Sequence, residues 1–196
     1  NLLENLIEIP FKKIIVTGSC WEYGNQTGLM SEDTKTINPS TFGLSKNSIL
    51  SFYDCICKEK KINYSWSRIF YCYGPNQKSN SIIPTIWRNI RLDQKNPINS
   101  PNTYQDYIYV DDVSKALIKM IKVPSPSGIY NIGSGKLYSV AQIAEIIYSY
   151  YGLKSPFETL NRNKIEGIKA DITKTRNLLQ WEPEISLKNG IIKSLK

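Results

Sequence analysis

Short apolar segments that end in glycine or turn residues alternate with longer segments of helical periodicity along this chain of 196 residues. Segments 13–17, 64–70 and 129–132 are rich in aliphatic or aromatic residues, as expected for buried strands, and 105–110 is expected to form a short strand. Helices are predicted at 40–60, 81–92, 111–122 and 139–151, with short ones from 173 and 187. This alternation predicts an α/β fold in which helical crossovers connect parallel strands.

The net charge of +8 is compatible with two kinds of anionic partner, a nucleic acid or a nucleotide diphosphate. The lysines are scattered over predicted helices, and no compact basic block with interleaved aromatic residues occurs. We therefore interpret the charge mainly as solvated helix faces and expect no nucleic-acid partner. No apolar stretch approaches the roughly 20 residues that a membrane span needs, so no membrane association is expected.

Cysteine and histidine usage narrows the possible chemistry. The four cysteines, at positions 20, 55, 57 and 72, include no Cys-x-x-Cys pair. We expect them to be buried and reduced, which indicates a cytoplasmic location, and we expect no metal site. The chain contains no histidine, which excludes a Ser-His-Asp triad and a histidine-activated cysteine nucleophile. Acid–base chemistry would have to use Tyr, Lys, Glu, Asp, Cys or Ser.

The start of the chain has the pattern of the end of an amphipathic helix. Leu2, Leu3, Leu6 and Ile9 are spaced as on one helix face, and no basic cluster of the signal-peptide type precedes them. We therefore expect that an upstream part of the protein is missing from this sequence.

Several motifs occur in a fixed order. The first predicted strand leads into Ser19, which lies four residues before Tyr23. The helix that follows has the frame of a Tyr-x-x-x-Lys motif, in which Phe42 takes the tyrosine position and Lys46 takes the lysine position. Five further motifs lie at 68–77, 104–113, 130–135, 170–174 and 179–183. Together these segments resemble the extended short-chain dehydrogenase/reductase family, which contains nucleotide-sugar epimerases and dehydratases.

The resemblance implies a proton-and-hydride site. It assigns Ser19 to polarise a sugar oxygen, and Lys46 to bind the nicotinamide ribose of NAD (or NADP). It also implies cofactor contacts from Thr17 and Tyr71. The family's tyrosine transfers a proton, and Phe42 keeps the ring but has no ionisable group.

Three explanations of Phe42 remain open. The protein could be an inactive homologue that still binds a nucleotide sugar or serves in dimerisation. Another group could supply the proton, with Cys20, Glu22 or a water held by Ser19 and Lys46 as candidates. The substitution could also be a sequence error or a local mutation.

Neighbouring residues bear on the reaction and the substrate. The resemblance places Cys20 and Trp21 where 4,6-dehydratases carry an Asp-Glu pair, which disfavours dehydration. It predicts substrate contacts from Ser19, Cys20, Trp21 and Tyr71, and from Gln105, which replaces an arginine that often pairs with the diphosphate. Arg162 could supply the diphosphate contact instead, or could be a solvated loop residue.

The resemblance also implies the architecture. It predicts a partial Rossmann-type doubly wound parallel sheet and a small C-terminal α/β substrate lobe. Residues 1–80 would form the second half of the Rossmann-type domain, and 81–196 mainly the lobe, interleaved with the last strands. The glycine-rich NAD turn of the family is absent from this sequence, so we expect the chain alone to bind NAD poorly and to be inactive. The implied parent is an NAD-dependent nucleotide-sugar epimerase or reductase for surface polysaccharides, and a homodimer formed through the 40–60 helix.

Overall fold

The computed structural model describes residues 12–95, 98–157 and 166–195, so the predicted helix end at 2–9 and Arg162 lie outside the described residues. A three-stranded parallel sheet forms the centre of the fold, in the order β1 (Lys13–Ser19), β3 (Asn63–Ile69), β7 (Gly128–Ile132). The three strands predicted from apolar runs are therefore confirmed, and they are parallel as expected.

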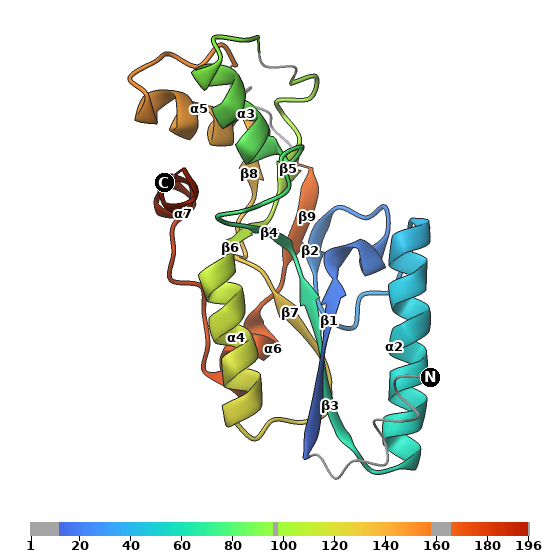
Figure 1. The fold of residues 1–196 in the computed structure, drawn as a ribbon. Helices are drawn as coiled ribbons and strands as arrows, with labels where there is room; N and C mark the ends of the chain where they lie inside the picture. Colours follow the sequence, from blue (N-terminus) through green and yellow to red (C-terminus); the bar gives the residue numbers. More distant parts are fainter. Residues whose placement is uncertain (1–11, 96–97, 158–165, 196) are drawn as a thin grey trace.

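Helices α2 (Thr41–Glu59) and α4 (Val110–Lys122) cover opposite faces of this sheet (Figure 1). Successive residues of a strand point to opposite faces. Accordingly, Ile14 and Val16 pack in the core cluster under α2, and Ile15 packs in the cluster under α4. This two-sided coverage explains the apolar run at 14–16 in β1, whereas β3 alternates aromatic residues with the buried serines Ser65 and Ser67.

Short strands extend the structure beyond the carboxyl ends of the central sheet. One four-stranded sheet has the order β2-β9-β5-β8, and a separate parallel pair joins β4 to β6. Their bounds are Gly28–Met30 for β2, Tyr71–Tyr73 for β4, Tyr104–Gln105 for β5, Tyr107–Tyr109 for β6, Tyr138–Ser139 for β8 and Gly167–Ala170 for β9.

The prediction of a single strand at 105–110 is wrong, because β5 and β6 belong to different sheets and the chain passes from one to the other at Asp106. The buried Asp106 carboxylate accepts hydrogen bonds from the backbone N–H groups of Ser134, Gly135 and Ala170, and from the Ser134 hydroxyl. These bonds tie the end of β7 and β9 to the β5–β6 junction. They also use two of the N–H groups in the glycine turn after β7.

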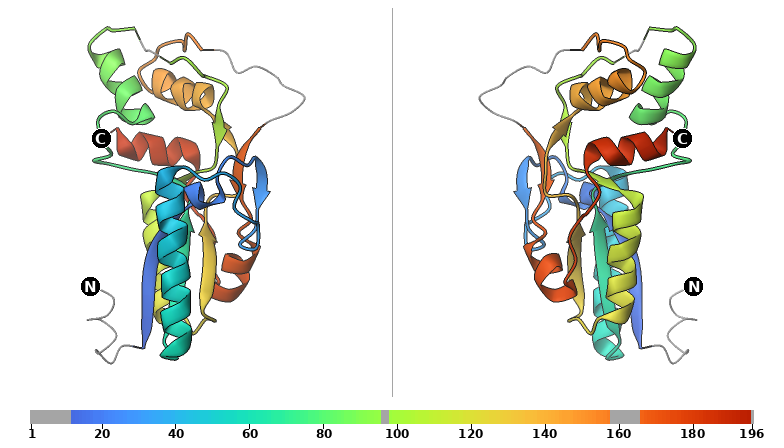
Figure 2. Two further views of the ribbon diagram at one scale, coloured as in Figure 1. Left: turned by 90° about the vertical axis from the view of Figure 1, so that its right-hand side faces the viewer. Right: turned by 90° about the vertical axis from the view of Figure 1, so that its left-hand side faces the viewer.

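Helix α6 packs beside β7 and α4, and three other helices pack at the end of the sheet toward which the strands point. Helices α3, α5 and α7 gather there around one apolar cluster, as the perpendicular views in Figure 2 show. The bounds are Ile82–Arg91 for α3, Val140–Tyr150 for α5, Thr173–Leu179 for α6 and Leu187–Ser194 for α7, and a 3₁₀ helix, η1, spans Cys20–Tyr23. All six predicted helices of the described region are therefore present, within one or two residues at most ends.

The cysteines follow the prediction only in part. None of them forms a disulfide, and Cys20 and Cys57 are buried, but Cys55 and Cys72 are exposed. Cys55 lies on the side of α2 that faces away from the sheet, and Cys72 lies on β4, which has β6 as its neighbour. None of the helices in the described ranges combines the length and apolar character that a membrane crossing requires.

Replacing Asp171 with alanine should weaken the start of α6. Its carboxylate accepts a hydrogen bond of 2.9 Å from the Thr173 N–H, and hydrogen bonds from Thr173 lower the pKa of Asp171. A lowered pKa stabilises the fold above the unfolded-state pKa near 4, and this stability is lost as the pH falls through the lower folded-state pKa. We expect Asp171→Ala to cost about 1 kcal/mol at pH 7, and less below about pH 4, in denaturant unfolding. An equal cost at both pH values would contradict this account.

Candidate active site

Ser19 is the last residue of β1 and the N-cap of η1. Its hydroxyl oxygen accepts a hydrogen bond of 3.2 Å from the Trp21 N–H, and its own N–H donates to Glu22 Oε1 at 2.6 Å. This reciprocal pair is a capping box, which the sequence Ser-x-x-Glu specifies locally. Because β1 ends here, Ser19 lies at the carboxyl edge of the parallel sheet, where ligands of open α/β sheets bind.

Lys46 reaches the same edge from α2. Its ammonium donates a hydrogen bond of 2.8 Å to the carbonyl oxygen of Thr17. Phe42 lies one turn earlier on α2, with its ring centre 5.9 Å from Lys46 Nζ and 52% of its surface exposed. The spacing i, i+4 places Phe42 and Lys46 on one face of α2, and the bond from Lys46 to Thr17 brings this face to the end of β1 that carries Ser19.

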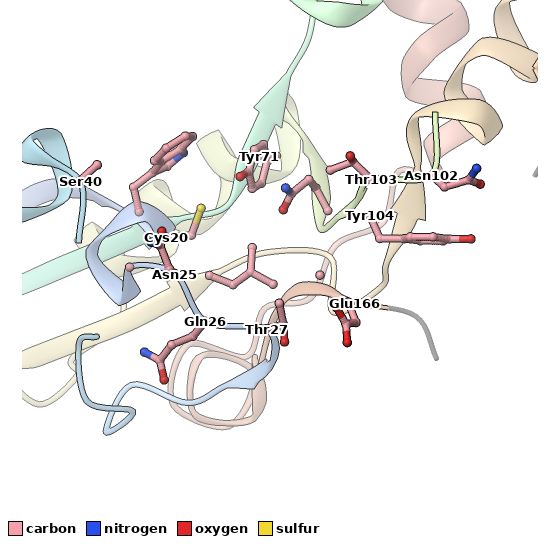
Figure 3. A pocket seen from close by; sticks show the side chains of 15 residues that line it. Cys20, Asn25, Gln26, Thr27, Ser40, Tyr71, Asn102, Thr103, Tyr104 and Glu166 are labelled. Atoms are coloured by element: carbon pink, nitrogen blue, oxygen red, sulfur yellow. The ribbon is translucent and has the colours of Figure 1, made fainter. Parts of the chain in front are cut away.

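A pocket of about 470 Å³ lies next to Ser19, between the η1 turn and the short strands of the second sheet (Figure 3). Of the predicted substrate residues, Cys20, Trp21, Tyr71 and Gln105 line it, whereas Ser19 precedes Cys20 and is not itself one of the lining residues. Its other lining residues are Gly24, Asn25, Gln26, Thr27, Ser40, Asn102, Thr103, Tyr104, Glu166, Gly167 and Ile168.

The buried Cys20 and the partly buried Tyr71 line one wall of this pocket, and in Figure 3 the Cys20 sulfur lies on the side that faces Tyr71. Cys20 is 2% exposed, and burial raises the pKa of its thiol to about 12. Burial likewise raises the pKa of the Tyr71 phenol. Both side chains are therefore protonated near neutral pH, and neither is a base there. Trp21 packs beside Tyr71 with ring centres 6.4 Å apart and is half exposed, so it lines the mouth of the pocket.

Gln105 also faces a second cavity of about 340 Å³, which shares Tyr71, Thr103 and Gln105 with the first. Gln77 lines this second cavity as well. Within the described part of the chain, the side-chain oxygens of Gln77 and Gln105 are buried and have no hydrogen-bond partner. A buried carbonyl oxygen without a partner is costly, and a ligand that brings N–H or O–H donors would satisfy both.

Glu22 does not line the pocket. Its side chain is fully buried, and its carboxylate accepts hydrogen bonds from Trp66 and Arg68 on β3. Of the groups that could replace the missing phenol, Glu22 is therefore engaged elsewhere, and Cys20 is a thiol with a raised pKa.

The motifs did not reveal several pocket residues. The segments 25–27, 102–103 and 166–168 line it from loops and short strands that have no periodic pattern. Gln26 holds the first of these segments, because its amide donates to the carbonyl oxygens of Tyr23 and Lys35. The role of Asp106 was missed too, and its place in the motif at 104–113 was the available signal.

The sequence profile of the NAD dependent epimerase/dehydratase family matches residues 1–133. The chain is 31% identical to a UDP-glucuronate 4-epimerase of Thermodesulfobacterium geofontis in an alignment that covers 97% of this chain and 60% of that protein. The chain belongs to the NAD dependent epimerase/dehydratase family.

Other members of this family are similar over the same length. A dTDP-4-dehydro-6-deoxyglucose reductase of Escherichia coli is 30% identical, over 98% of this chain and 63% of that protein. A UDP-glucuronic acid 4-epimerase of Bacillus cereus superposes with a TM-score of 0.88 at 26% identity, covering 99% of this chain and 63% of that one. That structure is a tyrosine-to-phenylalanine mutant in complex with UDP-4-deoxy-4-fluoro-glucuronic acid and NAD.

The α/β fold with parallel sheets is thus that of Rossmann-type epimerases. The chain spans 60% and 63% of the length of the two relatives compared by sequence.

Proposed function

We propose that this chain forms the nucleotide-sugar site of an NAD-dependent epimerase or reductase that makes surface-polysaccharide sugars. We use the term parent protein for a protein of the relatives' length that contains this chain. The observation that carries the proposal is the pocket beside Ser19, in which Cys20, Trp21, Tyr71 and Gln105 converge from separate segments. It opens at the carboxyl edge of the parallel sheet, where ligands of open α/β sheets bind, and the similar B. cereus structure is a complex with NAD and a UDP sugar analogue.

In the proposed complex, the sugar nucleotide lies along the pocket. Ser19 donates a hydrogen bond to the oxygen on the sugar carbon that is oxidised and reduced. The aromatic rings of Trp21 and Tyr71 cover the apolar face of the sugar, while Gln105 accepts a hydrogen bond from a ligand N–H or O–H. A glutamine cannot make the charged, bidentate contact of an arginine, so Gln105 would recognise a neutral group.

The residues near Lys46 fit a nicotinamide ribose. The ammonium has three N–H bonds, of which the Thr17 carbonyl accepts one, so two remain for the hydroxyl groups of a ribose. Tyr71 would form the wall of the pocket next to the nicotinamide ring. When bound, NAD (or NADP) supplies a hydride acceptor. The pyrophosphate would be held by a glycine-rich turn upstream in the parent protein.

Phe42 limits the rate of the reaction that the proposed site can catalyse. A phenylalanine at the proton-transferring position leaves the site able to bind but slow to react. The B. cereus mutant binds both a substrate analogue and NAD, so in that protein a phenylalanine in place of one tyrosine is compatible with binding. The alternative, a homologue without activity that binds nucleotide sugar, is favoured by the engagement of Glu22 and the raised pKa of Cys20.

The parent protein is proposed to be a homodimer, with residues 1–80 as part of its Rossmann-type domain and 81–196 mainly as its substrate lobe. Ile49 and Phe52 are exposed on α2, together with Cys55, on the side turned away from the sheet. Apolar side chains at this spacing form a stripe that a second copy of the helix would bury. Sedimentation equilibrium should give a dimer for the parent protein and a shift to monomer for Phe52→Glu. A monomeric parent would contradict the proposal.

Calorimetric titration of the parent protein with UDP-glucose, UDP-glucuronic acid and dTDP-glucose tests the binding function. At least one should bind, and Tyr71→Ala should weaken that affinity about 10-fold, because it removes an aromatic wall of the pocket. Tyr150→Ala is the matched control, since Tyr150 is an exposed tyrosine at the end of α5. Binding of none of the three ligands, or equal effects of both substitutions, would overturn the assignment.

A further inference from the structure

A fully buried carboxylate lies directly beneath Ser19. Glu22 has 0% exposure, and its Oε1 accepts the Ser19 N–H at 2.6 Å. The Trp66 indole N–H lies 3.0 Å from both of its oxygens, and Arg68 Nε donates to Oε2 at 2.8 Å. Buried charges are normally found only where such partners satisfy them. The position of this carboxylate is therefore fixed from several directions.

Arg68 is itself held in place. Only 5% of its surface is exposed, its guanidinium lies 4.5 Å from the ring centre of Tyr23, and it donates to the Glu32 carbonyl oxygen at 3.1 Å. Arg68 belongs to β3, the central strand of the parallel sheet. The ion pair thus connects the turn that carries Ser19 to the central strand of the sheet.

The backbone at Gly18 leaves room for this carboxylate. A Cβ atom at position 18 would lie 2.4 Å from Glu22 Oε1 and 2.1 Å from Trp66 Nε1. Both distances are well inside van der Waals contact. Glu22 therefore reaches the N–H of Ser19 only because residue 18 has no side chain.

Helix α2 holds the same turn from the other side. Asn47, next to Lys46, donates its amide N–H to the Glu22 carbonyl oxygen at 3.0 Å. A Cβ at Gly43 would lie 2.2 Å from the Trp21 carbonyl oxygen, so the helix backbone closely approaches the turn. The turn is thus held between α2, which carries Phe42 and Lys46, and β3, which carries Arg68.

We propose that Glu22 is a positioning residue, whose carboxylate, clamped by Arg68 and Trp66, fixes Ser19 relative to α2 in the orientation that binds the sugar oxygen. Glu22 does not touch the substrate in this assignment and transfers no proton. The inference rests on the proposed function only in giving Ser19 a ligand contact. The clamp itself follows from the hydrogen bonds within residues 18–68.

A double-mutant cycle in the parent protein separates positioning from general stabilisation. The background variant is Glu22→Leu combined with Arg68→Met, which removes both charges and leaves neither unpaired. Ser19→Ala should weaken the binding of UDP-glucose roughly 10-fold in the native background, the value of one hydrogen bond to a ligand. In the Glu22→Leu/Arg68→Met background the same change should cost less than about twofold, because Ser19 is no longer held in place.

Asp112→Asn is the matched control background. Asp112 is also a fully buried carboxylate, but it lies at the start of α4 and accepts the Ile185 N–H. In this background Ser19→Ala should retain its full effect. Equal effects of Ser19→Ala in the native and Glu22→Leu/Arg68→Met backgrounds would overturn the positioning role.

Hydrogen exchange of the Ser19 amide decides the inference independently of any ligand. The amide should be protected in the native protein and exchange much faster in the Glu22→Leu/Arg68→Met variant, while the amides of β3 keep their protection. Unchanged protection of the Ser19 amide would overturn the inference. If none of the three nucleotide sugars binds but this amide loses protection, the proposed function fails and the clamp stands.

Discussion

Phe42→Tyr in the parent protein is expected to raise the turnover of its nucleotide sugar by about 10²- to 10⁴-fold, the usual contribution of a positioned acid–base group. The side chain lies on the same face of α2 as Lys46, with the ring centre 5.9 Å from Nζ. A phenol placed there would meet a positive charge, which favours its ionised form. The turnover is measured as the rate at which UDP-glucose is converted to its 4-epimer, which is monitored in a coupled assay with saturating NAD.

Ile121→Tyr is the control for this substitution. Ile121 is also an exposed apolar residue of a helix that covers the sheet, but it lies on α4, away from Lys46 and from the proposed dimer face. This variant should leave the turnover unchanged. A native turnover already typical of the family, with no gain in Phe42→Tyr, would show that the proton follows another path. A water held by Ser19 and Lys46 would then be the leading candidate, because Glu22 is buried against Arg68.

Arg68→Met should be the most destabilising of the single substitutions considered, at about 3–5 kcal/mol. It leaves the carboxylate of Glu22 fully buried without its cationic partner. Denaturant unfolding at neutral pH measures the loss. The double variant Glu22→Leu/Arg68→Met should recover most of it, because no uncompensated charge remains in the interior.

An exposed ion pair provides the comparison. Arg176 and Glu182 are 3.2 Å apart, but more than half of each side chain is exposed. Arg176→Met should therefore cost less than about 1 kcal/mol. A loss in Arg68→Met as small as that in Arg176→Met would mean that water reaches Glu22 and that the pair is not a rigid clamp.

The parts of the fold that the sequence predicts are those with a local pattern. The helices α2, α4 and α5 show helical periodicity, and β1 and β7 are apolar runs that end in a turn. The strands β2, β5, β8 and β9 span two to four residues each, too few for a period to emerge. Their pairing depends on segments far apart in the chain, as with Tyr104 beside Gly167.

The candidate site likewise has residues that the sequence predicts and residues whose role it does not predict. Ser19, Phe42 and Lys46 are predictable because each belongs to a motif with fixed local spacing. The structural role of Glu22 is not, because its partners Trp66 and Arg68 lie more than 40 residues away. Asp106 is similar, since Ser134 and Ala170, which donate to its carboxylate, lie 28 and 64 residues further along the chain.

A crystal structure of the parent protein with NAD and the nucleotide sugar that binds most tightly tests the central claim most directly. The account predicts that the sugar diphosphate occupies the pocket lined by Cys20, Tyr71 and Gln105, with a sugar oxygen within hydrogen-bond distance of the Ser19 hydroxyl. It also predicts that Phe42 touches the sugar without donating to it. A ligand bound elsewhere, with this pocket empty at saturating concentration, would contradict the account.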